Sequence, residues 1–169
     1  RSQIQTQDPE YDFAAEALSF DEMQTTVNGL GRAVVSFHLS ELGAAMFVLA
    51  PYRRPMCIRT PSFTEGRLRE LMFGDAGWLS GYEEYRRAAD AGQPDAEALR
   101  ARWEAGMPTI LQALHDEWLR PVREELMERG ETRVVFVAGG LAGVLPLHAA
   151  AWRDEAGELR YLIEEMEIS

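Results

Sequence analysis

The feature that most constrains the fold is a short apolar run, Thr-Arg-Val-Val-Phe-Val-Ala, at residues 132–138. β-branched and aromatic residues dominate it without polar alternation, which is typical of a strand buried on both faces of a parallel sheet. Because parallel strands need long crossover connections, usually helical, the run predicts an α/β architecture in which helices cover the sheet.

The segments before this run show strand patterns and one helix signal. Residues 32–51 contain two apolar runs separated by Ser-Glu-Leu-Gly-Ala and predict a β-hairpin, and residues 56–61 predict a short third strand. Ahead of the hairpin, Ser19 followed by Glu22 forms a capping-box pattern that predicts a short helix. A hairpin, several helices and then a buried strand are typical of a layered α/β or α+β domain.

Between the hairpin and the apolar run, the apolar spacing becomes helical. Thr64 is the expected N-cap of a first helix, and further helices are predicted over residues 77–90 and 94–105. The most regular stretch is 107–130, where an apolar residue recurs at every fourth position: Ile110, Leu114, Trp118, Val122 and Leu126.

Two residues should interrupt and end this last helix. Pro121 is expected to kink or divide it near Arg120, and Gly130 is a favourable C-terminal cap. Further along the chain, residues 158–168 predict one more short strand.

Charge and cysteine content exclude several classes of function. The chain has 28 acidic and 17 basic residues and a net charge of −11, so it lacks the electrostatic footprint of a nucleic-acid partner. The basic residues are all arginine, which excludes a P-loop lysine, and a single cysteine, Cys57, excludes an internal disulfide framework. The apolar runs are too short to span a bilayer and the first residues do not resemble a signal peptide, so we expect a cytoplasmic protein without a membrane partner.

The glycine-rich stretch after the apolar run, with Gly139, Gly140 and Gly143, allows two interpretations. A phosphate-binding loop would need a lysine and a hydroxyl residue, and a dinucleotide fold would need Gly-x-Gly-x-x-Gly opening a helix. Neither pattern is present. We therefore interpret the glycines as a tight turn that uses positive φ angles.

Cys57 is the candidate nucleophile. Three arginines, Arg53, Arg54 and Arg59, stand near it in sequence and could lower the pKa of its thiol. The segment lacks the small residues that would expose the sulfur at a sharp turn. A structural cysteine, either buried or on an edge strand, is the favoured interpretation.

The candidate bases are three histidines. His148 follows the glycine stretch and could act at the end of an α/β strand, although we favour a half-buried structural role. His38 alternates with apolar neighbours and is expected to face solvent, and His115 is expected on a helix surface.

The remaining candidates do not form a site. His115, Asp116 and Glu117 are adjacent on a helix and point in different directions, so they cannot bind one metal ion together. Ser40 and Ser62 lack the turn of a nucleophile, and the acidic run at 163–168 is interpreted as a solvated strand edge. From the sequence we assign no catalytic, cofactor-binding or metal-binding residue.

Four pieces of the chain, in order, resemble a known family. They are the hairpin at 32–51, helices ending in "LQALHDEWLRPVREEL", the strand and turn "RVVFVAGGLAGVLPLHAAAW", and "LRYLIEEMEIS". This arrangement resembles the front half of a CHAT domain, a caspase-like domain often attached to helical repeats in bacteria. The most specific piece is the turn "G-x-L-P-L-H-A", which here holds Gly143 and His148.

The resemblance implies a caspase-like open sheet flanked by helices, preceded by the hairpin and a helical insertion. The resemblance itself covers roughly residues 30–169. Because the first residues are polar and acidic, we expect a linker or tail at 1–18, followed by an incomplete domain front half at 19–169. The family's activity is that of a cysteine endopeptidase acting on protein substrates without a cofactor. Its catalytic histidine and cysteine stand in motifs that would follow Ser169. The dyad therefore maps to no residue here, and Cys57 and His148 do not match it.

Three functional hypotheses remain. The first is a scaffold fragment of a bacterial CHAT-type peptidase, partnered by the C-terminal remainder of its domain, with a helical-repeat region upstream. The second is a non-catalytic interaction or regulatory module of the same fold. The third is a complete small enzyme that pairs Cys57 with His148. The fragment hypothesis also predicts an unpaired apolar strand edge and poor behaviour as an isolated monomer.

Overall fold

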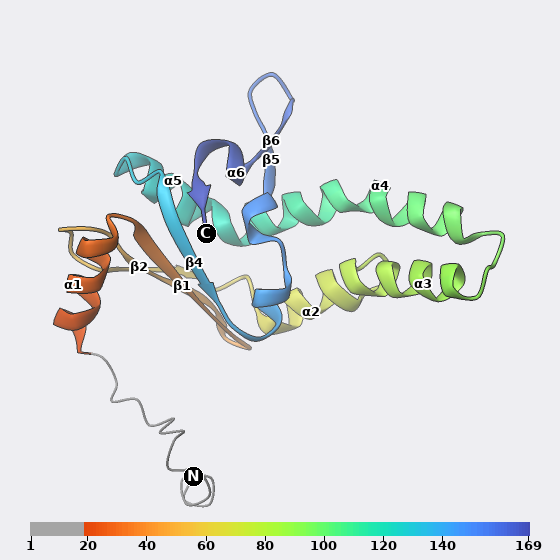
Figure 1. Cartoon of the computed structure of the whole chain (residues 1–169), viewed down its shortest axis with the longest axis horizontal. Coiled ribbons are helices and arrows are strands. Elements are labelled where there is room, and N and C mark those ends of the chain that lie inside the picture. The colour runs from red at the N-terminus through yellow and green to blue at the C-terminus, as the bar shows by residue number, and fades with distance from the viewer. Residues whose placement is uncertain (1–18) are drawn as a thin grey trace, which may run out of the picture.

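The computed structural model describes residues 19–169 (Figure 1), so the predicted linker or tail at 1–18 lies outside the described part of the chain. The first half contains α1 (Phe20–Leu30), β1 (Ala33–Ser40), β2 (Gly43–Leu49), β3 (Met56–Thr60), α2 (Glu65–Phe73), α3 (Trp78–Asp90) and α4 (Ala96–Leu114). The second half contains a π-helical turn (His115–Leu119), α5 (Arg120–Glu128), β4 (Arg133–Ala138), 3₁₀ turns at Gly140–Val144 and Leu147–Ala149, β5 (Ala151–Arg153), β6 (Leu159–Tyr161), α6 (Leu162–Glu165) and β7 (Glu167–Ile168).

The main sheet has five strands in the order β3-β2-β1-β4-β7. β1, β2 and β3 are antiparallel neighbours, whereas β1, β4 and β7 run parallel. The register pairs Val35 with Phe136 in the parallel part. The structure confirms the prediction of a mixed α/β domain in which helices flank a sheet.

The first helix and the hairpin form as their sequences predict. The Ser19 hydroxyl accepts a hydrogen bond from the Glu22 backbone N–H, and the Glu22 carboxylate accepts one from the Ser19 N–H, which completes the capping box. The hairpin turns through Glu41 and Leu42, since Ser40 pairs with Gly43. The third strand also forms, as β3.

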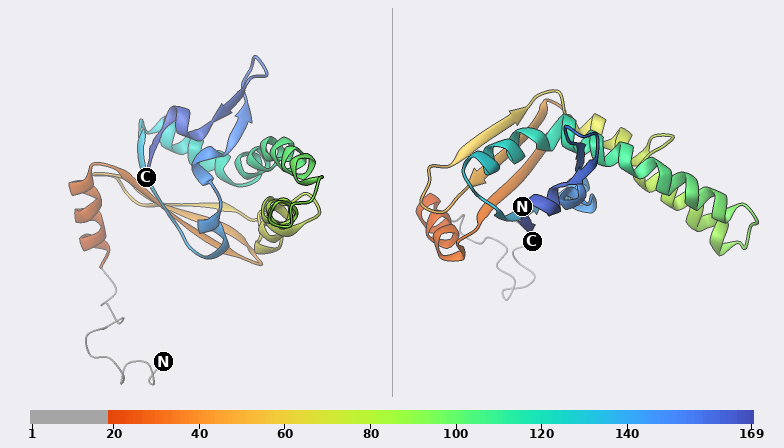
Figure 2. Two further views of the ribbon diagram at one scale, coloured as in Figure 1. Left: turned by 45° about the vertical axis from the view of Figure 1, so that its right-hand side comes forward. Right: turned by 90° about the horizontal axis from the view of Figure 1, so that it is seen from above.

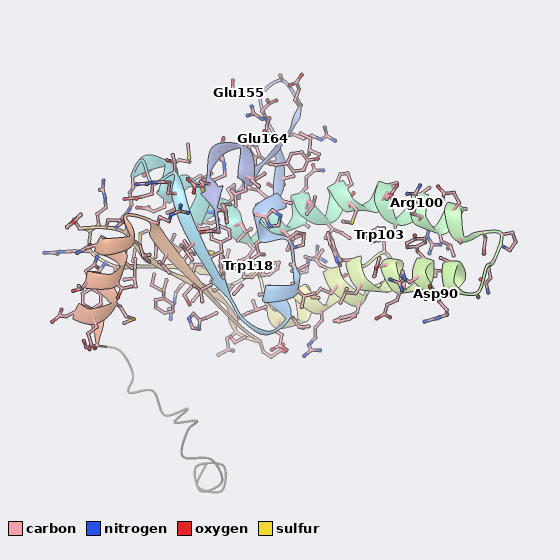
Figure 3. The ribbon with its side chains drawn as sticks, in the orientation of Figure 1. Asp90, Arg100, Trp103, Trp118, Glu155 and Glu164 are labelled. Carbon is pink, nitrogen blue, oxygen red and sulfur yellow. The ribbon has the colours of Figure 1, made fainter. Side chains whose placement is uncertain are left out.

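One face of the sheet is covered by helices and carries the core. Trp118, from the π-helical turn, is fully buried where the helices meet the sheet (Figure 3). Its ring stacks on Phe63 at 4.7 Å and meets the edge of Phe37 at 5.4 Å. The covered strand positions are Ala33, Val35, Phe37, Ala44, Met46, Val48 and Val134. A large aromatic side chain thus joins the long helix to the sheet.

The opposite face of the sheet, which we call the open face, is not covered by α2, α3, α4 or α5, and α1 lies on this side only at one end of the sheet (Figure 2, left). In the left view of Figure 2, α4 and α5 lie on one side of the sheet. On the other side, Phe47 is 47% exposed and Val137 is 50% exposed. The prediction that the 132–138 strand is buried on both faces is therefore wrong for the described residues, although its parallel pairing is right. The open-face side chains are Val34, Ser36, His38, Ala45, Phe47, Leu49, Cys57, Arg59, Arg133, Val135 and Val137.

α3 and α4 form a helical hairpin that projects from the sheet (Figure 2, right). Trp103 holds the two helices together, because its indole N–H donates to the Trp78 carbonyl and its ring stacks near Tyr85. α4 runs unbroken through Pro108, so the predicted separation of helices 94–105 and 107–130 is wrong. Pro108 lacks a backbone donor and its ring crowds the carbonyl four residues earlier, but the packing of α4 against α3 maintains the helix around it.

The division predicted near Arg120 is confirmed. α4 ends at Leu114, five residues form a π-helical turn, and α5 begins at Arg120 with Pro121 in its first turn. Gly130, with a φ of 71°, follows the end of α5.

The C-terminal segment departs from the prediction of one strand at 158–168. β6 pairs with β5 in a separate two-stranded sheet, α6 follows, and β7 joins the main sheet beside β4. A short helical turn between β6 and β7 carries the chain from one sheet to the other. None of the helices within residues 19–169 combines the length and apolar character needed to cross a bilayer.

Candidate functional site

A hollow of about 480 Å³ lies at the carboxyl ends of β1 and β4. Ligands of parallel α/β sheets bind at such an edge, where the chain leaves neighbouring strands in different directions. Here β1 turns back into β2, while β4 continues into the glycine-rich 3₁₀ turn. The wall of the hollow has polar side chains from Ser36, His38 and Glu65. Its apolar surface includes Val137 and Leu68.

Ser36 and His38 form the one hydroxyl–imidazole pair of this hollow. They share the open face of β1 because they are two residues apart, and Ser36 Oγ lies 3.1 Å from His38 Nε2. The edge of the His38 ring meets Phe47 at 5.2 Å. As predicted, His38 is exposed.

A nucleophile–base pair also needs a third group that orients the base. Within residues 19–169 no carboxylate hydrogen-bonds to His38, and Glu65 instead pairs with Arg69 at 2.7 Å. The arrangement can bind a polar group but does not form a complete hydrolytic triad. Sequence reasoning missed Ser36, although its spacing from His38 on a predicted strand was the available signal.

The glycine-rich stretch is a tight turn, as interpreted from the sequence. Gly140 has a φ of 59°, and a side chain at Gly143 would lie 2.9 Å from the Ala138 carbonyl oxygen. Gly139 has an ordinary φ of −111° and open space around it. Positive φ thus applies to Gly140, whereas Gly143 is needed for close backbone approach.

Cys57 is exposed on β3, at the edge of the main sheet, which confirms an edge-strand cysteine. Arg59 shares its face of the strand. Arg53 instead pairs with Glu131 at 3.4 Å and donates to the Arg129 carbonyl.

His148 lies in the 3₁₀ turn after β4 and is exposed rather than half-buried as expected. The rim position of this turn explains the exposure, since Leu145 and Leu147 face the core in its place. Cys57 lies on β3, and β2 and β1 lie between β3 and β4. The axes of β3 and β4 are therefore three strand spacings, or about 14 Å, apart. The structure therefore does not bring Cys57 and His148 together, and the hypothesis of an enzyme built on that pair is wrong.

His115 is buried, with 2% of its surface exposed, so its predicted surface position is wrong. The β5–β6 hairpin covers this side of the helix, and Trp152 stacks on the imidazole at 4.9 Å. Nδ1 of His115 lies 2.8 Å from a carboxylate oxygen of Asp116. Burial lowers the pKa of His115, and Asp116 only partly opposes that effect.

The neighbouring acidic residues, Asp116 and Glu117, are engaged by a histidine and an arginine of this chain. Glu117 receives two hydrogen bonds of 2.7 Å from Arg67, and Asp116 faces His115. Across residues 19–169 there is no group of three potential ligand side chains that could hold a metal ion.

Ser40 and Ser62 have ordinary structural positions. Ser40 caps the hairpin turn, where its hydroxyl donates to the Gly43 carbonyl and accepts from the Leu42 N–H. Ser62 is exposed in the turn before α2.

The acidic run at 163–168 is more than a solvated edge, because its carboxylates are paired. Arg123 donates two hydrogen bonds of 2.8 Å to Glu165, and its guanidinium lies 3.9 Å from the Trp152 ring centroid. Glu164 pairs with Arg160 and Glu167 with Arg32, both at 2.6 Å. These partners are distant in sequence or on another element, which explains why the pairing was missed.

No protein-family model matches this chain, and no match is found among curated proteins.

Proposed function

We propose that residues 19–169 form the scaffold of a CHAT-type, caspase-like cysteine endopeptidase from a bacterium. In this proposal the catalytic histidine and cysteine belong to the remainder of the same domain. The chain's own task is to hold the central strands in place. Neither Cys57 nor His148 takes part in the reaction.

The observation that carries the proposal is the order in which the parallel strands are added. β4 pairs beside β1, and β7 pairs beside β4, so each new parallel strand extends the sheet on the same side. The turn with Gly143 and His148 begins the connection from β4 to β7, which continues through β5, β6 and α6. A further parallel strand would join at β7, which is the direction in which the resemblance places the dyad.

The chemistry follows from that dyad. The histidine would take the proton of the cysteine thiol, and the thiolate would attack the carbonyl carbon of a peptide bond. Backbone N–H groups would stabilise the negative charge that develops on the carbonyl oxygen. The substrate is a protein, no cofactor takes part, and the setting is cytoplasmic, with a helical-repeat region upstream and neither nucleic acid nor membrane as a partner.

The test is covalent labelling with a peptidyl acyloxymethyl ketone, which alkylates the nucleophile of cysteine peptidases. We expect the longer polypeptide that contains this chain to be labelled at a cysteine after residue 169, and the chain of residues 1–169 to remain unlabelled. Labelling at Cys57, removed by Cys57→Ala, would overturn the proposal.

The second candidate is a non-catalytic interaction module with the same fold. The apolar open face favours it, because such a surface suits binding as well as intramolecular packing. A gene whose sequence after residue 169 lacks either the histidine or the cysteine motif would select this candidate over the peptidase.

A further inference from the structure

The open face is an uncovered surface in a position where sheets of this kind are normally covered. β1, β4 and β7 form the parallel part of the sheet, where packing on both faces is the rule, whereas the antiparallel part formed by β1, β2 and β3 can leave one face in solvent. Phe47 and Val137, both about half-exposed, are its largest exposed apolar contributors. An unmatched face of this kind indicates a missing layer.

The strand register brings the open-face residues into two rows. In the first row Val137, Ser36, Phe47 and Cys57 lie side by side across β4, β1, β2 and β3. In the second row His38, Ala45 and Arg59 lie side by side. The second row therefore places an imidazole and a guanidinium on either side of the small side chain of Ala45.

The charge of this face is opposite to that of the whole molecule. The chain has a net charge of −11, yet β1, β2, β3 and β4 contain no acidic residue. Glu167 of β7 is already paired with Arg32. Arg59 and Arg133 form no ion pair within residues 19–169. The open face is therefore apolar and cationic on an acidic protein.

Charge decides which partner fits this face. A second copy placed face to face would oppose arginines with arginines, which costs free energy. An amphipathic helix with acidic flanks would match both the apolar first row and the cations beside it. A helix is favoured over a strand, since a sheet face is covered by a packed layer rather than by edge pairing.

We propose that the open face is the docking surface for an amphipathic helix with acidic flanks, carried by the remainder of the same domain on the same polypeptide. Phe47 and Val137 contact its apolar stripe, and Arg59 and His38 contact its carboxylates. This inference rests on the proposed function for the origin of the helix.

Cys57 provides a built-in reporter for the test, because the only thiol of the chain is exposed on this face. The chain of residues 1–169 is treated with the thiol reagent DTNB at low salt. The probe is a synthetic helical peptide with a leucine stripe and glutamate flanks, and its matched control carries lysines in place of the glutamates.

We expect the glutamate peptide to slow the reaction of Cys57 about tenfold at about ten times its dissociation constant, and the lysine peptide to give no protection. Arg59→Glu should weaken the glutamate peptide about fivefold or more. Arg87→Glu, an exposed arginine on α3 away from this face, should leave binding unchanged. Three results would overturn the docking proposal. These are equal protection of Cys57 by the two peptides, equal binding of the glutamate peptide by the two variants, and protection that coincides with dimerisation of the chain.

The same reporter separates this inference from the proposed function. In the longer polypeptide, Cys57 should react at least tenfold more slowly than in residues 1–169. A polypeptide that protects Cys57 but lacks the dyad would overturn the peptidase proposal alone. One that carries the dyad but leaves Cys57 equally reactive would overturn the docking proposal alone.

Discussion

Single residues in the glycine-rich turn should differ sharply in their tolerance of a side chain. Gly139→Ala meets open space and should leave the free energy of unfolding nearly unchanged. Gly140→Ala must adopt a φ of 59° and should cost about 1 kcal/mol. Gly143→Ala would place a methyl group 2.9 Å from a backbone oxygen and should cost about 1–3 kcal/mol. Urea unfolding of the three variants gives the order, and a larger cost for Gly139→Ala than for Gly143→Ala would contradict it.

His115 should make stability depend on pH. Burial holds the pKa of the folded state below the ordinary value of 6.5, so the unfolded chain binds a proton first as the pH falls. The free energy of unfolding should therefore decrease from about pH 7 towards pH 5, by at most about 1.4 kcal/mol per pH unit from this residue. Above the unfolded pKa the contribution of this residue no longer changes with pH.

The variant His115→Phe keeps a ring against Trp152 and removes the titration. We expect its unfolding free energy to vary less with pH in this interval than that of the unchanged protein. The control is His148→Phe, at an exposed position, which should retain the full pH dependence. Identical slopes for all three proteins would show that His115 is not the titrating group.

At the scale of elements, α6 is held against α5 by the pair of Arg123 and Glu165. Both side chains are only about one-fifth exposed, and two hydrogen bonds join them. Glu165→Gln should lower the free energy of unfolding by about 1–2 kcal/mol, because a mostly buried bidentate pair loses its charge complement. Glu164→Gln is the matched control. Its more exposed pair within four residues should contribute at most about 0.5 kcal/mol.

Elements with local signals were predictable, and those fixed by distant contacts were not. The capping box at Ser19 and the turn around Glu41 depend on neighbours in sequence, and both form as predicted. The burial of His115 depends on Trp152, which arrives with the β5–β6 hairpin from later in the chain. The spacing of apolar residues around His115 contains no information about that contact.

The same distinction applies to the candidate site. Ser36 and His38 share a strand face by simple alternation, whereas Glu65 and the glycine turn join them only through the sheet and α2. The open face was mispredicted for a related reason. A continuous apolar strand indicates that both of its faces can be buried, but its sequence does not say which other element packs on each face.

At the scale of the whole molecule, the open face should make association sensitive to salt. At low ionic strength the arginines of two open faces and the net charge of −11 keep copies apart. Screening at about 0.5 M salt shortens the range of that repulsion to a few ångströms, so apolar contact through Phe47 should then favour self-association. Sedimentation velocity at low and high salt measures this change.

The matched variants for this experiment are Phe47→Gln and Leu42→Gln. Phe47 lies on the open face, whereas Leu42 is 92% exposed at the tip of the hairpin turn. Phe47→Gln should suppress the salt-induced association and Leu42→Gln should not. Suppression by Leu42→Gln alone would place the contact at the hairpin tip.

The pairing of β1 with β4 has a consequence for the time course of folding. Ala33 and Val134 are partners although about one hundred residues separate them, so closing this contact carries a large entropic cost. The β1–β2 hairpin and the α3–α4 hairpin involve near neighbours and can assemble within microseconds to milliseconds. During synthesis the middle of the sheet must wait until β4 has left the ribosome. Until then Val35 and Phe37 have no β4 beside them, and this interval is when the nascent chain is most exposed to aggregation and in most need of chaperones.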